Sequence, residues 1–472
     1  MKDKKNIYFT AMALIILFIL LSGIMLFHHQ EKGVASSVTP DMEMKSPTEI
    51  IEKTPIDEAD PTEQLPTTED PNQTESNQSN ENQNNTPSNN QTKPNTSNNK
   101  KPSTNNTTPN NNSNSNTTTP TNPPVENPNV NVEPQKPKTV TEWLNTMSLE
   151  EKIAQMIIIS FDGKTMNTTL QNKLAYNPGG VILFSGNISD YNNTTKLISD
   201  MQANVDIPLF ISIDQEGGRV QRIKNISGKT MTIVPPMWGI GATNDYSRAY
   251  QTGRTLGQEL KQFGINMDFA PVIDVVPDVS AGVIKDRSFG SDPYLVAKMG
   301  TSLARGLTET GVTPVYKHFP GHGATITDSH VALPIVNKTK EELLNSDLVP
   351  FKEAISANAK VIMIGHLAVP NITGSNIPAS LSKDIITGLL KNELGYNGLV
   401  ITDALNMKAI TDNYSEKNIY ELAINAGVNI LLMPKSLESA INSIKQSVNE
   451  GKISEQQINT SVRKILELKM NG

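Results

Sequence analysis

The 472-residue sequence contains no cysteine. Disulfide bonds, a thiolate nucleophile, cysteine-ligated zinc and a cysteine-linked lipid are therefore excluded. Aromatic residues are scarce, at 5%, and the net charge is −7, with the lysines scattered rather than clustered. Because nucleic-acid binding depends on a basic patch or stripe, we expect no nucleic-acid partner.

Large apolar residues are almost missing from about residue 40 to residue 137, where Asn, Thr, Ser, Pro, Gln and Glu dominate. A segment of this composition cannot bury enough apolar surface to offset its chain entropy, so we predict a disordered linker over residues 31–138. A flexible coil of this length has a root-mean-square reach of about 50–60 Å. One folded unit over residues 139–472 remains, a size that suits a single domain.

One long hydrophobic run extends from Ile7 to Phe27, directly after Lys2, Lys4 and Lys5. It supplies the about 20 residues that cross a bilayer and exceeds the roughly 7–15-residue apolar region of a cleaved signal peptide. Because lysines beside a span stay cytoplasmic, we predict a single-pass anchor over residues 1–30 in the cell membrane, with the folded unit outside the cytoplasm. The alternative is cleavage at Ala35, which would secrete the protein.

Eight short apolar runs follow in the folded part, and most are continuous, which is typical of strands buried on both faces. Amphipathic helical segments separate them, and Ser148 and Glu151 predict a capping box near the start of the domain. The predicted strands are Met156–Phe161, Gly180–Phe184, Pro208–Asp214, Ile265–Val275, Thr313–Phe319, Val361–Leu367, Gly398–Ala404 and Val428–Pro434. The helical segments lie at 190–204, 245–263, 293–307, 340–358, 382–393 and 415–425, with a final pair over 436–470.

This alternation predicts an α/β fold in which the strands close into a single (β/α)8 barrel of the TIM type. An open, doubly wound sheet is the alternative. It is less favoured because eight strands in a segment of this length suit a closed barrel, and because no Gly-x-Gly-x-x-Gly turn follows an early strand.

Polar residues gather where the predicted strands end, which is where barrel enzymes carry their chemistry. Metal binding is the first hypothesis to test, because all four histidines of the folded part belong to this group. His318 and His322 are four residues apart, but Pro320 and two glycines place them in a loop rather than on a helix. We therefore expect neither a catalytic metal nor a cofactor. The strand-end residues are Asp214, Glu216, Arg222, Asp274, Lys317, His318, His322, His366 and Asp403, with His330 in the loop after the fifth strand.

Paired acid chemistry fits these residues better. Retaining glycoside hydrolysis needs one carboxylate that captures the anomeric carbon and a second group that protonates the leaving oxygen. Asp403 is the candidate for the first role, with a structural Asp that bonds nearby amides as the alternative. Asp328 and His330 are the candidates for the second, because a carboxylate beside an imidazole favours the protonated ring and fixes its orientation. The alternative is an Asp that makes a turn next to an exposed His.

The segment Lys317-His318-Phe319-Pro320-Gly321-His322-Gly323, followed by Asp328-Ser329-His330, resembles the signature of glycoside hydrolase family 3 β-N-acetylglucosaminidases of the NagZ type. Further segments resemble other parts of the same family in the same order. They are 148–156, 214–222, 269–275, 286–290 and 399–405.

The resemblance implies an exo-acting, retaining enzyme that removes terminal β-linked N-acetylglucosamine (GlcNAc) from peptidoglycan fragments. Asp403 would form the covalent glycosyl-enzyme, and His330, polarised by Asp328, would be the general acid/base. We expect Lys317 to bind the sugar more directly than His318, because neighbouring strand residues point to opposite sides. Arg222 could instead pair with Glu216. The residues implied to hold the sugar hydroxyls are Asp214, Arg222, Arg287, Lys317 and His318.

Two features separate the sequence from parts of this family. Position 324 is Ala, where family members often carry Asp, which leaves the hydrogen bonding of that loop open. The sequence also ends soon after the last helical pair, whereas the family's β-glucosidases commonly use a second domain that supplies a Glu acid/base. We therefore rank another family 3 glycosidase, a β-glucosidase or β-xylosidase, second, and a non-catalytic wall-binding barrel third. We expect the protein to act as a monomer.

Overall fold

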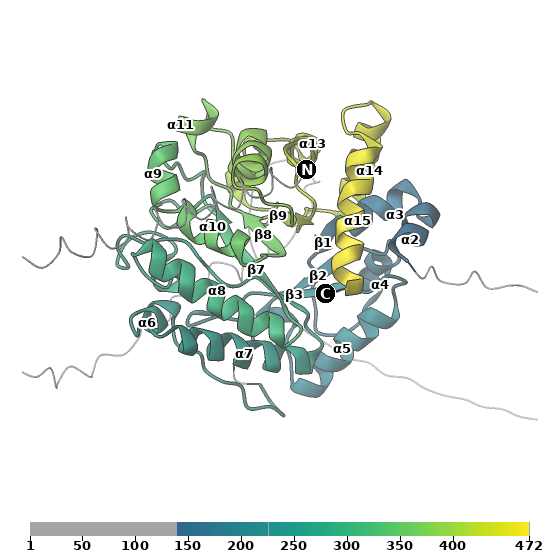
Figure 1. Ribbon diagram of the computed structural model, residues 1–472. Coiled ribbons are helices and arrows are strands. Elements are labelled where there is room, and N and C mark those ends of the chain that lie inside the picture. The colour runs from purple at the N-terminus through teal and green to yellow at the C-terminus, as the bar shows by residue number, and fades with distance from the viewer. Residues whose placement is uncertain (1–138, 225, 472) are drawn as a thin grey trace, which may run out of the picture. The chain divides into compact units, whose positions relative to one another are not determined.

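The computed structural model describes residues 139–224 and 226–471 (Figure 1). The anchor predicted over 1–30 and the linker predicted over 31–138 lie outside the described residues. Within the described ranges, no helix combines the length and the apolar character that a bilayer span requires.

Eight parallel strands form one sheet in the order β10-β1-β2-β3-β6-β7-β8-β9. The first and last strands of this order also meet, because the Thr402 N–H donates to Ile430 O at 3.1 Å and the Leu405 N–H to Leu432 O at 2.8 Å. This contact closes the sheet, so the fold fits a TIM-type barrel and not an open doubly wound sheet. The strands are β1 (Ile157–Ile159), β2 (Gly180–Leu183), β3 (Phe210–Ile213), β6 (Met267–Asp268), β7 (Thr313–Phe319), β8 (Val361–Ile364), β9 (Leu399–Thr402) and β10 (Leu431–Leu432).

Each predicted strand contains one of these strands, but most are shorter than expected. Only β7 has the predicted bounds, and the run 265–275 contains just the two residues of β6. Pro271 has no N–H to donate to a neighbouring strand, which is a physical reason for the early end of β6. Val272 still forms an isolated parallel bridge with Lys317, so the chain stays beside β7.

A small hairpin that the sequence analysis did not predict follows β3. It pairs β4 (Gln215–Gly217) with β5 (Val220–Gln221) in antiparallel fashion. Gly217 and Gly218 have φ values of 98° and 56°, a region that glycine enters without steric cost. The hairpin turns the chain back, so that the segments with Glu216 and Arg222 lie at the same end of the barrel.

The helices begin and end close to the predicted bounds, with two corrections. The segment 340–358 splits into two helices, and 382–393 forms the π-helix η4 (Asp384–Glu393). Side-chain caps fix many helix starts, including the predicted box of Ser148 and Glu151. The longer helices are α5 (Tyr191–Ala203), α7 (Tyr246–Phe263), α8 (Pro293–Glu309), α10 (Leu348–Ser356), α13 (Glu416–Ala426), α14 (Leu437–Asn449) and α15 (Glu455–Asn471). The shorter ones are α2 (Val140–Thr146), α3 (Leu149–Gln155), α4 (Thr168–Leu174), α6 (Met237–Gly241), α9 (Lys340–Asn345), α11 (Pro370–Thr373), α12 (Lys408–Thr411), η1 (Ser185–Asn187), η2 (Lys285–Arg287) and η3 (Ala379–Leu381).

These helices cover the outside of the barrel (Figure 1). Helices α7 and α8 lie along each other, and α15 packs against α2 and α3, which joins the last helix to the first two described. The barrel strands are buried along almost their whole length, and their side chains form one continuous hydrophobic core with the inner faces of the helices. A rigid scaffold therefore holds the ends of the strands.

Candidate active site

Three charged side chains meet where β3, β4 and β7 end. Lys317 Nζ lies 2.7 Å from Asp214 Oδ1 and 2.7 Å from Glu216 Oε1. Burial by itself would lower the pKa of Lys317, but the two carboxylates raise it above its usual value, so the ammonium group stays charged. The Asp-x-Glu spacing suits this arrangement, because residues two apart in an extended chain point to the same side.

Arg287 binds the same glutamate. Its Nε and Nη2 atoms donate to Oε2 and Oε1 of Glu216, both at 2.7 Å, in the bidentate geometry that makes strong ion pairs. Burial by itself would raise the pKa of Glu216. The neighbouring charges of Arg287 and Lys317 have the larger, opposite effect and hold the pKa well below its usual value, so the carboxylate is ionised. Arg222 Nη2 lies 3.5 Å from Asp214 Oδ2. Glu216, which the sequence analysis considered only as a partner of Arg222, thus pairs with Arg287 and Lys317.

A third carboxylate, that of Asp274, holds the start of the loop after β7. Asp274 Oδ2 lies 2.7 Å from His318 Nδ1, and Asp274 Oδ1 accepts the backbone N–H of His322 at 2.6 Å. Since a carboxylate accepts, Nδ1 of His318 donates and its Nε2 is the nitrogen that can face a ligand. Gly323 lets this loop pass close to the segment after β6, because a Cβ there would lie 2.0 Å from Val275 O. Lys317 and His318 bind different carboxylates, and their expected ranking as sugar ligands stays a prediction.

Asp403 follows β9 and is partly exposed at the end of the barrel. Its Oδ1 accepts the backbone N–H of Ala404 at 2.8 Å. Burial raises the pKa of Asp403, but His366, His318 and the Ala404 N–H lower it overall, so the group is a carboxylate at neutral pH. His366 is fully buried, and its Nε2 donates to Ala404 O at 2.9 Å while its Nδ1 accepts from the Ser380 hydroxyl at 2.7 Å. The histidine therefore supports the backbone next to Asp403.

The loop after β7 brings Asp328 and His330 to the same end of the barrel. The backbone N–H of Ala409, in the segment after Asp403, donates to Ser329 O at 3.1 Å. Burial lowers the pKa of His366, an effect that Asp403 opposes and His330 reinforces. Asp328 Oδ1 accepts the backbone N–H of His330 at 2.9 Å, and the described contacts include no hydrogen bond between this carboxylate and the imidazole. His330 itself is exposed.

The structure thus places all eight predicted site residues at one end of the barrel and adds others. Glu216 binds Arg287 and Lys317, and Asp274 binds His318. Both carboxylates lie beside predicted strand ends, and that position is the signal in the sequence that points to them. Asp268 was missed altogether. It lies inside an apolar run and matches no part of the quoted motifs, so the sequence offers little to distinguish it.

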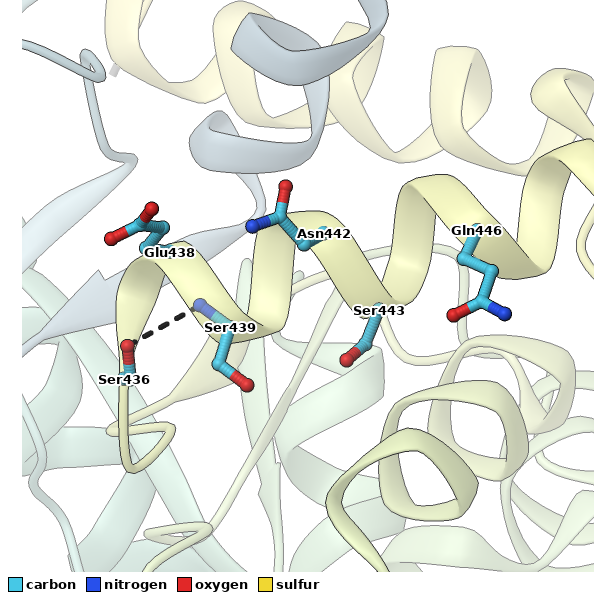
Figure 2. A pocket seen from close by; sticks show the side chains of 6 residues that line it. All are labelled: Ser436, Glu438, Ser439, Asn442, Ser443 and Gln446. Carbon is cyan, nitrogen blue, oxygen red and sulfur yellow. Dashed lines mark hydrogen bonds between the residues drawn. The ribbon is translucent and has the colours of Figure 1, made fainter.

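Two surface hollows lie away from these residues. One hollow, of about 430 Å³, runs along α14. Six polar residues between Ser436 and Gln446 line it, as Figure 2 shows. The other, of about 620 Å³, lies between α4 and α14 and includes Tyr176. Neither contains a member of the buried charged network. In the described part of the chain, no group of three or more acidic or histidine side chains is arranged to hold a metal ion.

A closed parallel barrel with buried carboxylates, cations and imidazoles at the ends of its strands has the organisation of a barrel enzyme that binds a polar substrate. Comparison with known proteins specifies the class. The model of the glycosyl hydrolase family 3 N-terminal domain matches residues 148–468. This match covers well over half of the sequence, and the chain therefore belongs to glycosyl hydrolase family 3.

Individual relatives agree with this assignment. The chain is 35% identical over 346 residues to beta-hexosaminidase A of Pseudoalteromonas piscicida, an alignment that covers 66% of this chain and 57% of that protein. It is 32% identical over 333 residues to beta-hexosaminidase LpqI of Mycobacterium tuberculosis, which covers 68% of this chain and 83% of that one. The chain thus spans little more than half of the first relative and most of the second.

Solved structures show the same similarity. A family 3 beta-N-acetylglucosaminidase from Paenibacillus sp. str. FPU-7 aligns with a TM-score of 0.66 and 37% identity, over 69% of this chain and 62% of that one. M. tuberculosis LpqI aligns with a TM-score of 0.64 and 30% identity, over 70% of this chain and 96% of that one.

Proposed function

We propose that the protein is a retaining, exo-acting β-N-acetylglucosaminidase that removes terminal β-linked GlcNAc from peptidoglycan fragments. The observation that carries the proposal is that the segment after Asp403 meets the loop of Asp328 and His330 at one end of a family 3 barrel, through the Ala409–Ser329 backbone bond. Relatives named as β-hexosaminidases and β-N-acetylglucosaminidases support the choice of sugar.

In the first step, a carboxylate oxygen of Asp403 bonds to the anomeric carbon as the bond to the leaving oxygen breaks. His330 gives its proton to that oxygen, and the sugar stays on Asp403 as an ester. In the second step, water attacks the anomeric carbon, His330 takes a proton from it, and Asp403 is released as a carboxylate. The lowered pKa of Asp403 suits this role, because the nucleophile has to be ionised.

In this proposal, Asp328 acts on His330 through the backbone of the loop. Its carboxylate holds the His330 N–H and shapes the turn that presents the imidazole. The predicted contact with the ring would form when the exposed His330 turns toward a bound substrate, since catalytic hydrogen bonds often tighten only in the complex.

The network around Lys317 is the proposed site for the non-reducing sugar. A neutral pyranose is bound by dense hydrogen bonding, and charged partners make the stronger bonds. Asp214 retains acceptor capacity and is partly exposed, while Arg222, Arg287 and His318 bring donors to the same place. Their ion pairs hold these groups in position before a sugar arrives.

The test is to trap the sugar on the full chain with a slow 5-fluoro substrate that keeps the 2-acetamido group of GlcNAc, and to locate it by peptide mass spectrometry. We expect the label on Asp403. Asp403→Asn should lower kcat for an aryl β-N-acetylglucosaminide by roughly 10⁴-fold or more, as loss of a nucleophile does elsewhere. Asp412→Asn is the matched control, because Asp412 is exposed and close in sequence, and it should leave kcat unchanged.

Other outcomes separate the competing functions. Turnover of aryl β-glucosides or β-xylosides without turnover of the acetamido sugar would reject the proposed specificity. Wild-type protein that binds wall sugars and never turns over would favour a non-catalytic barrel. Release of GlcNAc from a GlcNAc–N-acetylmuramic acid disaccharide, measured by mass spectrometry, tests the proposed natural substrate.

We also propose that the protein is held in the cell membrane by residues 1–30, with the barrel outside the cytoplasm. The support is the sequence alone, namely the apolar run from Ile7 to Phe27 behind three lysines.

A further inference from the structure

Asp268 is the last residue of β6 and has no exposed surface. It is paired in register with Ile213 of β3 and Pro314 of β7, so it lies between the strands that carry Asp214 and Lys317. Its Oδ1 accepts the backbone N–H of Gln215 at 2.9 Å. Its Oδ2 is buried and makes no hydrogen bond with any described residue.

The other buried carboxylates of the site have cationic or several hydrogen-bonding partners that stabilise a negative charge, whereas Asp268 has one backbone donor. Glu216 receives three short polar contacts from Arg287 and Lys317. Asp274 receives the His318 imidazole and the His322 backbone N–H. Asp268 receives a single neutral backbone donor, which is too little to stabilise a buried negative charge.

The charges around Asp268 also oppose its ionisation. Asp214 and Glu216 face it from the β3–β4 side, and Lys317 faces it from β7. Burial raises the pKa of Asp268 well above its usual value and the two carboxylates add to this effect, while the Gln215 N–H and Lys317 oppose it. Carboxyl groups in one site are thus driven to opposite protonation states by their surroundings.

We propose that Asp268 is a positioning residue of the sugar site and works there as a neutral carboxylic acid. Through its bond to the Gln215 N–H, it fixes the backbone between Asp214 and Glu216, the two carboxylates that hold Lys317. A neutral acid does this without adding a third negative charge that would compete for the ammonium group. The connection to sugar binding rests on the proposed function, whereas the charge state rests on the geometry alone.

Two matched variants of the full chain test the proposal. Asp268→Asn keeps the shape, the acceptor for Gln215 and the neutral charge, so GlcNAc affinity, kcat and KM should stay at their wild-type values. Asp268→Ala removes the acceptor, and we expect weaker GlcNAc binding and up to about 10²-fold lower kcat/KM, the size that a small misplacement of a site produces. Loss of activity in Asp268→Asn with the fold intact would overturn the proposal.

The charge state has its own measurements. A carboxyl group whose pKa is raised on folding keeps its proton in the folded state, while the unfolded chain loses it above about pH 4. The contribution of Asp268 to the stability of the wild type therefore falls as the pH rises from 4 to 7. Asp268→Asn lacks this contribution, so the difference in denaturant midpoint between the two proteins should grow over this range. A difference independent of pH would contradict a neutral Asp268.

Infrared spectroscopy of the wild type at neutral pH supplies a measurement that needs no folded variant. With ¹³C-labelled aspartate, a protonated carboxyl band should be present, and its absence would overturn the proposal. A protein that shows the band and the pH-dependent difference but neither binds nor cleaves β-linked GlcNAc would refute the proposed function and the positioning role, while the neutral charge would stand.

Discussion

Glu216 is 2% exposed, and its carboxylate contacts both Arg287 and Lys317. Removing one partner of a buried ion pair leaves the others without compensation, at a cost of roughly 3–5 kcal/mol. We therefore predict that Glu216→Gln lowers the free energy of unfolding by this amount at pH 7 and weakens sugar binding. Because folding lowers the pKa of Glu216, its contribution is present above the ordinary carboxyl pKa of about 4.3 and is lost as the pH falls through the lower folded value.

Asp286→Asn provides the control at a neighbouring ion pair. Arg219 Nε lies 3.1 Å from Asp286 Oδ1, but the two side chains are 45% and 36% exposed. Such pairs contribute at most about 1 kcal/mol because water screens them. Denaturant unfolding of both variants between pH 3 and pH 7 measures the contrast, and equal losses of stability would contradict the proposed role of burial.

Individual site residues differ in how far the sequence could predict them. Asp403, Lys317 and His318 end buried strands, so the barrel topology alone brings them together. The contact between Asp328 and the backbone N–H of His330 agrees with the alternative of an Asp that makes a turn, and the sequence by itself does not distinguish this turn from a contact with the ring. Asp268 could not be predicted, because its environment depends on β3 and β7, which come from distant parts of the chain.

At the scale of elements, α7 and α8 pack through glycines. A Cβ on Gly253 of α7 would lie 2.0 Å from Leu303 O of α8, and one on Gly306 of α8 would lie 2.3 Å from Tyr250 O. We predict that Gly253→Ala separates the two helices and lowers stability by about 1–3 kcal/mol, the usual cost of overpacking. Thermal unfolding of the purified protein measures the change.

Gly239→Ala is the control for this substitution. Gly239 lies in α6, and a Cβ there meets no atom within 4 Å. Since alanine is favoured over glycine in a helix by roughly 0.5–1 kcal/mol, this variant should be as stable as the wild type or slightly more stable. A loss of Tm as large as that of Gly253→Ala would show that the effect does not depend on the close approach of α7 and α8.

The elements themselves were predictable where a local signal existed. Continuous apolar runs indicated each barrel strand, and Gly264 and Gly427 end their helices with φ values of 88° and 108°, as the glycines in the sequence suggest. The strand ends were less predictable, because hydrophobicity continues past the last paired residue. The break between α9 and α10 falls at Ser346, whose hydroxyl donates to the carboxylate of the buried Asp347 at 2.6 Å, and no periodic pattern in the sequence indicates that contact.

On the scale of the whole molecule, the barrel is closed by segments from both ends of the described chain. β10 lies between β1 and β9, and α15 packs against α2 and α3. The alternation of strands and helices predicted a parallel sheet, and eight strands in a segment of this length favoured a closed barrel over an open sheet.

The proposed membrane anchor makes a prediction for the full chain. Deleting residues 2–30 removes the apolar run from Ile7 to Phe27 and none of the described fold, so the protein should move from the membrane fraction to the soluble fraction. kcat/KM for a small aryl substrate should not change, because the strand-end residues of the barrel are untouched. Replacing Lys2, Lys4 and Lys5 with Gln is the complementary variant, since it keeps the run and weakens the orientation signal. Wild-type protein found free outside the cell, with a new N-terminus near Ala35, would show instead that the segment is a cleaved signal.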